Sequence, residues 1–131
     1  MENFTSKIKE STRELNAKER IFMKDTSNAT KIDKAIDEFA KNNERFIITP
    51  TAWAVLEIHN EKSKDRKDYE NYVIIDESGE KYVTGSPSFW RSFREIWDEM
   101  TAESDEAFQI VIYKKPSNNY NGKDFITCSI I

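Results

Sequence analysis

The chain has few of the residues on which many sites depend. Its single cysteine, Cys128, cannot form a disulfide within the chain and predicts a reducing compartment, the cytoplasm. One cysteine and one histidine are too few for a zinc site built from those ligands, and the three glycines form no glycine-rich phosphate loop. The sequence contains no apolar run long enough for a membrane span and no apolar segment of a secretory signal near residue 1. We therefore expect neither a cofactor nor a membrane partner.

The charged residues are unevenly distributed. The net charge is −4, and an excess of acid normally argues against nucleic acid as a partner. Six acidic residues lie within 95–106, however, and outside that stretch residues 46–131 carry nine acidic and ten basic side chains. The overall charge therefore does not exclude a basic surface on one face of the protein.

Composition divides the chain into two regions. Residues 1–45 are expected to form an N-terminal arm, in which 1–29 have few apolar anchors and are mobile or loosely docked. A short helix is predicted near 30–42, because apolar residues recur there at helical spacing. Residues 46–131 are expected to form one domain, long enough to bury a modest core.

From Phe46 the apolar residues alternate, which is typical of strands. Strands are predicted over 46–59, with a bend at Pro50, and over 69–77, 81–84, 108–115 and 124–131. A helix is predicted over 87–101, because Ser86 can cap it, Pro87 suits its first turn, and an apolar stripe follows that includes Phe89 and Phe93. Five short strands with a helix between the third and fourth follow the order of an OB-fold, a small, partly open barrel. An α+β sandwich of the same elements is the alternative.

Two connections of this barrel are basic, and in OB-folds they flank the groove that binds oligonucleotides. The connection at 60–68 carries Lys62, Lys64, Arg66 and Lys67. The second, within YKKPSNNYNGKDF at 113–125, combines lysines with aromatic rings: Tyr113, Lys114, Lys115, Tyr120, Lys123 and Phe125. If Val73, Ile75 and Val83 point inward, alternation turns Tyr72 and Tyr82 outward, and Trp53 lies on the polar side of its strand.

Outward rings can stack on bases while lysines neutralise phosphates, so these residues predict a nucleic-acid interface. Each ring has a simpler interpretation as a packed cross-strand partner, and each loop lysine as a solvated side chain. The N-terminal helix is a candidate cover for Trp53. The prediction depends on the coincidence of two basic loops and several outward rings, not on any one residue.

The stretch NYVIIDESGEKYVTGSPSFWRSFREIWDEM, with the closing GKDFITCSI, resembles single-stranded DNA-binding proteins of phages that infect Gram-positive bacteria. The resemblance covers roughly residues 46–131. It implies an OB-fold that coats single-stranded DNA without strong sequence preference during replication or recombination, in the host cytoplasm. Single-stranded DNA is then the partner, with replication or recombination proteins as further candidates, and the oligomeric state stays open.

Two other functions compete with DNA binding. Catalysis is not expected, because His59 has no nucleophile motif beside it and Cys128 occupies an inward strand position. A protein-binding module is the stronger alternative, for example a small phage-encoded inhibitor of a host factor or a defence system. In that interpretation the acidic stretch at 95–106 could mimic DNA.

Overall fold

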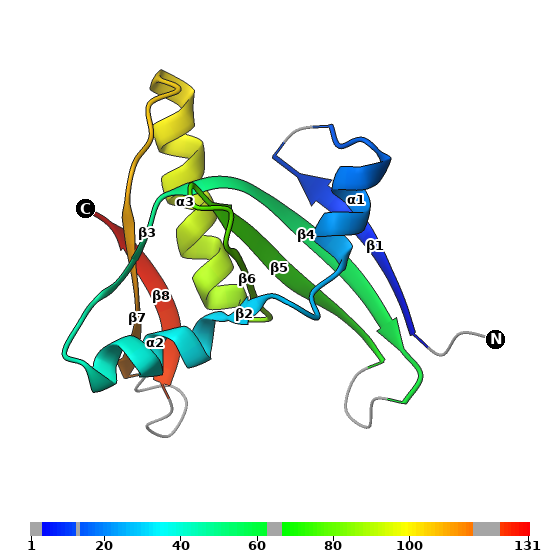
Figure 1. Ribbon diagram of the computed structural model, residues 1–131, viewed down its shortest axis with the longest axis horizontal. Coiled ribbons are helices and arrows are strands. Elements are labelled where there is room, and N and C mark those ends of the chain that lie inside the picture. The colour runs from blue at the N-terminus through cyan, green and yellow to red at the C-terminus, as the bar shows by residue number, and fades with distance from the viewer. Residues whose placement is uncertain (1–3, 13, 63–66, 117–123) are drawn as a thin grey trace.

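The structure is a computed structural model that describes residues 4–12, 14–62, 67–116 and 124–131. The described residues form two β-sheets and three helices (Figure 1). The five-stranded sheet has the order β1 (Phe4–Ser11), β4 (Pro50–Asn60), β5 (Asp68–Asp76), β6 (Lys81–Thr84), β2 (Thr30–Lys31). The three-stranded sheet has the order β3 (Phe46–Ile48), β7 (Ile110–Pro116), β8 (Asp124–Ile130). The helices are α1 (Ala17–Lys24), α2 (Ile32–Lys41) and α3 (Pro87–Glu103). None of the described helices is both long and apolar enough to span a bilayer.

Local sequence signals set the boundaries of the central elements. The β5–β6 turn ends at Gly79, whose φ of +88° is a conformation that other residues rarely adopt. The Asp76 carboxylate accepts hydrogen bonds from the backbone N–H groups of Ser78 and Glu80, both at 3.0 Å. Helix α3 begins as predicted, since the Ser86 hydroxyl accepts from the backbone N–H of Phe89. The predicted β5–β6 hairpin and the predicted helix are therefore both present.

The expected barrel does not form, because the described strands make two sheets and neither closes. Strands β3 and β4 are separated only by Thr49 and join the two sheets on one side, since β3 pairs with β7 and β4 pairs with β5. Closure on the other side would need β8 to pair with β6. Instead, β2 pairs with β6, and α3 meets β8 where the Ser88 hydroxyl donates to the carbonyl of Ile126 at 3.0 Å.

The main core lies between α3 and the two sheets. Phe89 and Phe93 are fully buried there, as the apolar stripe predicts, whereas Trp97 is half-buried against Phe108. Stacked rings extend this core from α3 to the five-stranded sheet. The ring centroids of Trp90 on α3 and Tyr72 on β5 are 4.7 Å apart. This core joins the helix to both sheets.

A second core lies on the opposite face of the five-stranded sheet. Leu15 and Met23, in and beside α1, are buried against a set of strand residues: Ala54, Leu56, Ile58, Val73 and Val83. Lys81 is also buried, and its ammonium donates to the carbonyls of Phe22 and Asp25 at the end of α1, both at 2.5 Å. Burial lowers the pKa of Lys81 below its usual value.

The described residues before residue 30 therefore dock on the sheet through β1 and α1, where the sequence predicted a mobile or loosely docked arm. Strand β1 pairs antiparallel with β4 from Phe4 to Ser11, with an irregularity between Ile8 and Glu10. Two buried side chains and one paired strand are enough to dock it, although its overall composition is polar. The division of the chain into an arm at 1–45 and a domain at 46–131 stays a prediction.

Candidate nucleic-acid interface

Four of the predicted interface residues lie outside the described residues: Lys64, Arg66, Tyr120 and Lys123. The other nine fall on three separate surfaces. Trp53, Tyr72 and Tyr82 lie on the five-stranded sheet, Lys62 and Lys67 at the β4–β5 connection, and Tyr113, Lys114, Lys115 and Phe125 on the β7–β8 hairpin.

Trp53 and Tyr72 do not face outward as predicted. Trp53 is 4% exposed, with the Trp90 ring at 5.3 Å and the Arg94 guanidinium over its face at 4.1 Å. Tyr72 is 7% exposed and stacks on the same Trp90. Helix α3, rather than the N-terminal helix, covers both rings. They stabilise the core in this structure and offer no open face to a base.

Tyr82 is half-buried beside them and packs against Phe46 with a centroid separation of 5.3 Å. Burial raises the pKa of its hydroxyl to about 12, with Asp76 and Glu80 adding to the shift. Tyr82 therefore also belongs to the packed side of its sheet, where the sequence predicted an outward ring.

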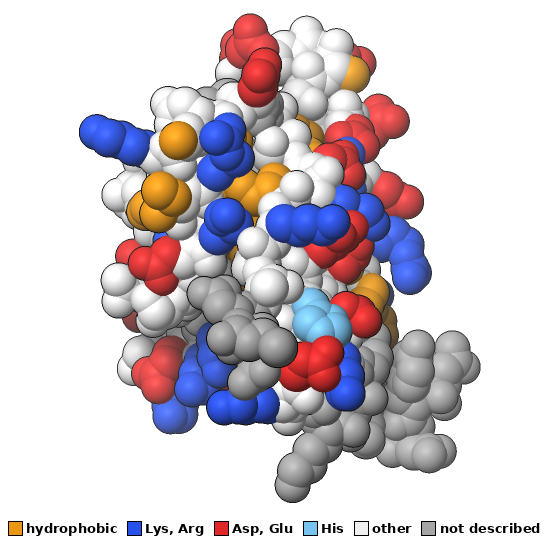
Figure 2. Space-filling model, turned by 90° about the vertical axis from the view of Figure 1, so that its right-hand side faces the viewer, with side chains coloured by type: hydrophobic (Ala, Val, Ile, Leu, Met, Phe, Trp, Pro, Cys, Tyr) orange, Lys and Arg blue, Asp and Glu red, His pale blue; other side chains and the backbone are white. Residues whose placement is uncertain are grey.

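The β4–β5 connection is less basic than its lysines suggested. Lys62 is exposed, but the ammonium of Lys67 lies 3.2 Å from the carboxylate of Glu61. His59 lies between two carboxylates, with Nδ1 at 2.7 Å from Asp68 and Nε2 at 2.5 Å from Glu61. The hydrogen bond to Asp68, and then the one to Glu61, raise the pKa of His59 above 6.5. Figure 2 shows this pale blue ring next to red acidic side chains.

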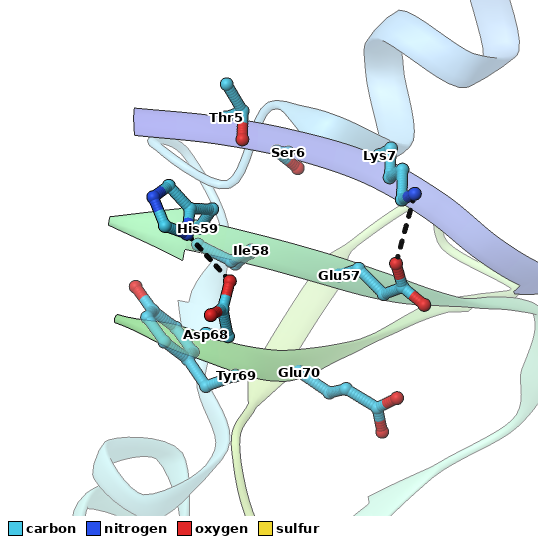
Figure 3. Close-up of a pocket in the computed structure, with 9 residues that line it drawn as sticks. All are labelled: Thr5, Ser6, Lys7, Glu57, Ile58, His59, Asp68, Tyr69 and Glu70. Atoms are coloured by element: carbon cyan, nitrogen blue, oxygen red, sulfur yellow. Dashed lines mark hydrogen bonds and ion pairs between the residues drawn. The ribbon is translucent and has the colours of Figure 1, made fainter. Parts of the chain in front are cut away.

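An open cavity of about 640 Å³ lies beside this cluster, across β1, β4 and β5 (Figure 3). Its charged side chains already pair with one another, since Lys7 meets Glu57 at 3.4 Å and His59 meets Asp68. Glu70 adds a further acid, which is bound to Lys9 at 2.7 Å. A phosphate placed here would have to displace these pairs and face their carboxylates. The cavity is therefore unsuited to a nucleic-acid backbone.

The β7–β8 hairpin arranges its residues differently. On its inner face Ile110, Ile112 and Cys128 are buried, as alternation predicts. Burial raises the pKa of the Cys128 thiol to about 12. The opposite face, which we call the hairpin face, is half-buried or exposed and consists of Val111, Tyr113, Lys115, Phe125, Thr127 and Ser129.

Register brings the predicted aromatic and basic residues of the hairpin face together. Lys115 lies directly opposite Phe125, and Tyr113 is two residues before Lys115 on the same strand. The hydroxyls of Tyr113 and Ser129 share a hydrogen bond of 2.8 Å, which fixes the edge of the tyrosine ring. The two rings thus lie on one surface, and Lys115 is a neighbour of both.

Lys114 is separated from this group, because its alternation directs it to the other side of β7. Its ammonium pairs with the Asp37 carboxylate of α2 at 3.0 Å. Three residues of the hairpin face were not among the predicted interface residues: Val111, Thr127 and Ser129. Once the strands are placed in register, the alternation that buries Ile110 and Cys128 identifies all three.

Comparison of the chain with protein-family models, with curated proteins and with solved structures finds no match. Among the described residues, no group of three His, Cys, Asp or Glu side chains is placed to hold a metal ion.

Proposed function

We propose that this protein binds single-stranded DNA through the hairpin face. The observation that carries the proposal is the register of β7 with β8, which sets the half-buried Tyr113 and Phe125 and the exposed Lys115 on one face of the hairpin. Aromatic rings offer stacking platforms to any base, and a lysine among them neutralises the phosphate of the same nucleotide. Because stacking does not read base identity, the binding is without strong sequence preference.

The connectivity supports the same function. The bent stretch β3–β4 is followed by β5, β6, α3, β7 and β8, which is the strand and helix order of an OB-fold, although the described strands form two sheets and no barrel. The resemblance of residues 46–131 to phage single-stranded DNA-binding proteins points the same way. The role we propose is coating of single strands in phage DNA replication or recombination, in the host cytoplasm, without catalysis.

The test is a titration of fluorescein-labelled oligo(dT), followed by anisotropy, at several salt concentrations. A label on the DNA is preferable to tryptophan emission, because Trp53 is buried and Trp90 is stacked within the core. Tyr113→Ala and Phe125→Ala should each weaken binding by about 1–3 kcal/mol, or roughly 5- to 140-fold, with the salt slope nearly unchanged. Lys115→Ala should flatten the slope of log K against log salt by about 0.7, because one phosphate contact is lost.

Two matched controls separate the interface from the fold. Tyr113→Phe keeps the ring and loses the hydroxyl, so it should bind as tightly as wild type to within about 1 kcal/mol, the net value of one hydrogen bond. Lys18→Ala removes an exposed lysine from α1, far along the chain from the hairpin, and should leave the slope unchanged. If a folded Tyr113/Phe125 double alanine variant binds oligo(dT) like wild type, the proposal is wrong.

One observation favours the alternative of a protein-binding module. Helix α1 exposes Ile21 at 66% and Phe22 at 48%, next to Lys18 and Lys24. Figure 2, which views the side of α1 and β1, shows orange hydrophobic side chains among blue lysines and arginines. Adjacent exposed apolar groups are typical of protein contacts. A well-folded protein that does not bind oligo(dT) at low salt would favour this function over DNA binding.

A further inference from the structure

A small cleft adjoins the hairpin face, between α2 and the three-stranded sheet. Its volume is about 360 Å³, and its lining is mainly apolar: Ile36, Ala40, Phe46, Val111, Ile112 and Tyr113. Tyr113 and Val111 belong both to this lining and to the hairpin face, so the two surfaces are continuous. The Phe39 ring stacks on Phe46 at 5.3 Å and supports the cleft from the side of α2.

The cleft also borders backbone that β3 leaves unpaired. Strand β3 begins at Phe46, which pairs with Ile112, and its register with β7 covers only residues 110–112. From Tyr113 onward, that edge of β7 therefore has no partner in β3. Backbone N–H and C=O groups at such a strand edge, beside an apolar lining, are the combination that small-molecule sites use to fix the orientation of a flat, polar-edged ring.

Two exposed charged residues lie at the cleft, Glu44 and Arg45. A guanidinium suits a phosphate, whereas the neighbouring carboxylate repels one. These two residues test whether a phosphate binds here. Removal of the Arg45 charge should lower the affinity for DNA, and removal of the Glu44 charge should raise it.

We propose that this cleft holds one base of the bound strand, with the adjoining phosphate at Arg45. The inference rests on the proposed function and adds a second base position, in the cleft, beside the open stack on Tyr113. The volume lies near the lower end of the roughly 300–1,000 Å³ typical of ligand sites, which suits a single base better than a larger group. Continuity with the hairpin face favours a base over the apolar side chain of a protein partner.

The cleft can be filled without changing the core. Ala40 is exposed at the cleft, so Ala40→Trp should occupy it and weaken oligo(dT) binding at least about 5-fold, with little change in salt slope. The matched control is Ala102→Trp, at an exposed alanine of α3 outside the cleft, which should bind like wild type. Arg45→Gln should weaken binding and flatten the salt slope by about 0.7, and Glu44→Gln should strengthen binding.

A direct measurement uses thymidine 5′-monophosphate as the probe. Methyl NMR signals of Ile36, Val111 and Ile112 should shift on its addition, and they should not shift in Ala40→Trp. If Ala40→Trp binds oligo(dT) like Ala102→Trp while Tyr113→Ala weakens binding, the cleft inference is overturned and the proposed function stands. If neither Ala40→Trp nor Tyr113→Ala changes binding, both are overturned. Shifts caused by an apolar peptide but not by the nucleotide would also overturn the inference.

Discussion

Docking of the N-terminal segment on the five-stranded sheet is tested by replacing one buried side chain of α1. Met23 is 5% exposed and packs in the cluster that contains Leu56, Val73 and Val83. Full burial of such a side chain contributes about 1.5–3 kcal/mol, and a cavity adds to the cost of its removal. Helix α1 covers the sheet from one side and can move toward it, which fills part of the cavity. Met23→Ala should therefore lower the free energy of unfolding by about 2–3 kcal/mol, within the lower half of the about 2–5 kcal/mol typical of such changes.

The matched control is Ile21→Ala, two residues away on the same helix. Ile21 is 66% exposed, so its truncation should change the free energy of unfolding by no more than about 0.5 kcal/mol. Both variants introduce alanine into α1, and a difference between them therefore reports burial and not helix propensity.

The assay is urea unfolding, with thermal unfolding as a second measurement. A loss of about 2–3 kcal/mol corresponds to a fall in melting temperature of roughly 6–15 °C for a chain of this size. Amide exchange in α1 adds local information, because a helix that opens on its own loses protection before the sheet does. If the two variants unfold at the same midpoint and show the same exchange in α1, this segment is not packed on the sheet.

Three further predictions concern single residues. Phe93→Ala should lower the free energy of unfolding by about 3–5 kcal/mol in urea titrations, because the ring is fully buried between Phe89 and Trp90, and an unchanged midpoint would contradict this packing. NMR titration should give His59 a pKa above 6.5, and this pKa should fall toward 6.5 in Asp68→Asn. Because the pKa is raised in the folded state, the contribution of His59 to stability is present below pH 6.5 and is lost as pH rises through the folded pKa. Cys128, with a pKa of about 12, should resist a thiol reagent at pH 8 until urea unfolds the protein, and rapid labelling of the native protein would contradict its burial.

Elements with strong local signals could be predicted from the sequence. Ser86 and Pro87 mark the start of α3, and Gly79 supplies the positive φ of the β5–β6 turn. Strand β2 has no comparable signal, because it is only two residues long and exists through its pairing with β6. Since β2 occupies the edge of β6 that barrel closure would need, the open arrangement of the sheets could not be predicted from local pattern.

The direction of the rings on the five-stranded sheet was predicted wrongly for a related reason. Alternation separates Trp53 and Val55 from Ala54 and Leu56, but it does not say which set meets α3. The run from Ala52 to Leu56 contains no polar residue, and such a run is typical of a strand that is buried on both faces. This signal was available, and it argues against an open stacking surface at Trp53.

The same rule applied to β7 supports the proposed interface. Residues 110–113 read Ile-Val-Ile-Tyr, again without a polar residue, so this strand also has the pattern of burial on two faces. Ile110 and Ile112 are buried, yet Val111 and Tyr113 are only half-buried. On the five-stranded sheet, α1 supplies the second cover. The corresponding cover over Val111 and Tyr113 would be the bound strand, with its bases stacked on the hairpin face and one of them in the adjoining cleft. In this interpretation the apolar residues of β7 are needed for binding of the strand, whereas those of β4 are needed for folding.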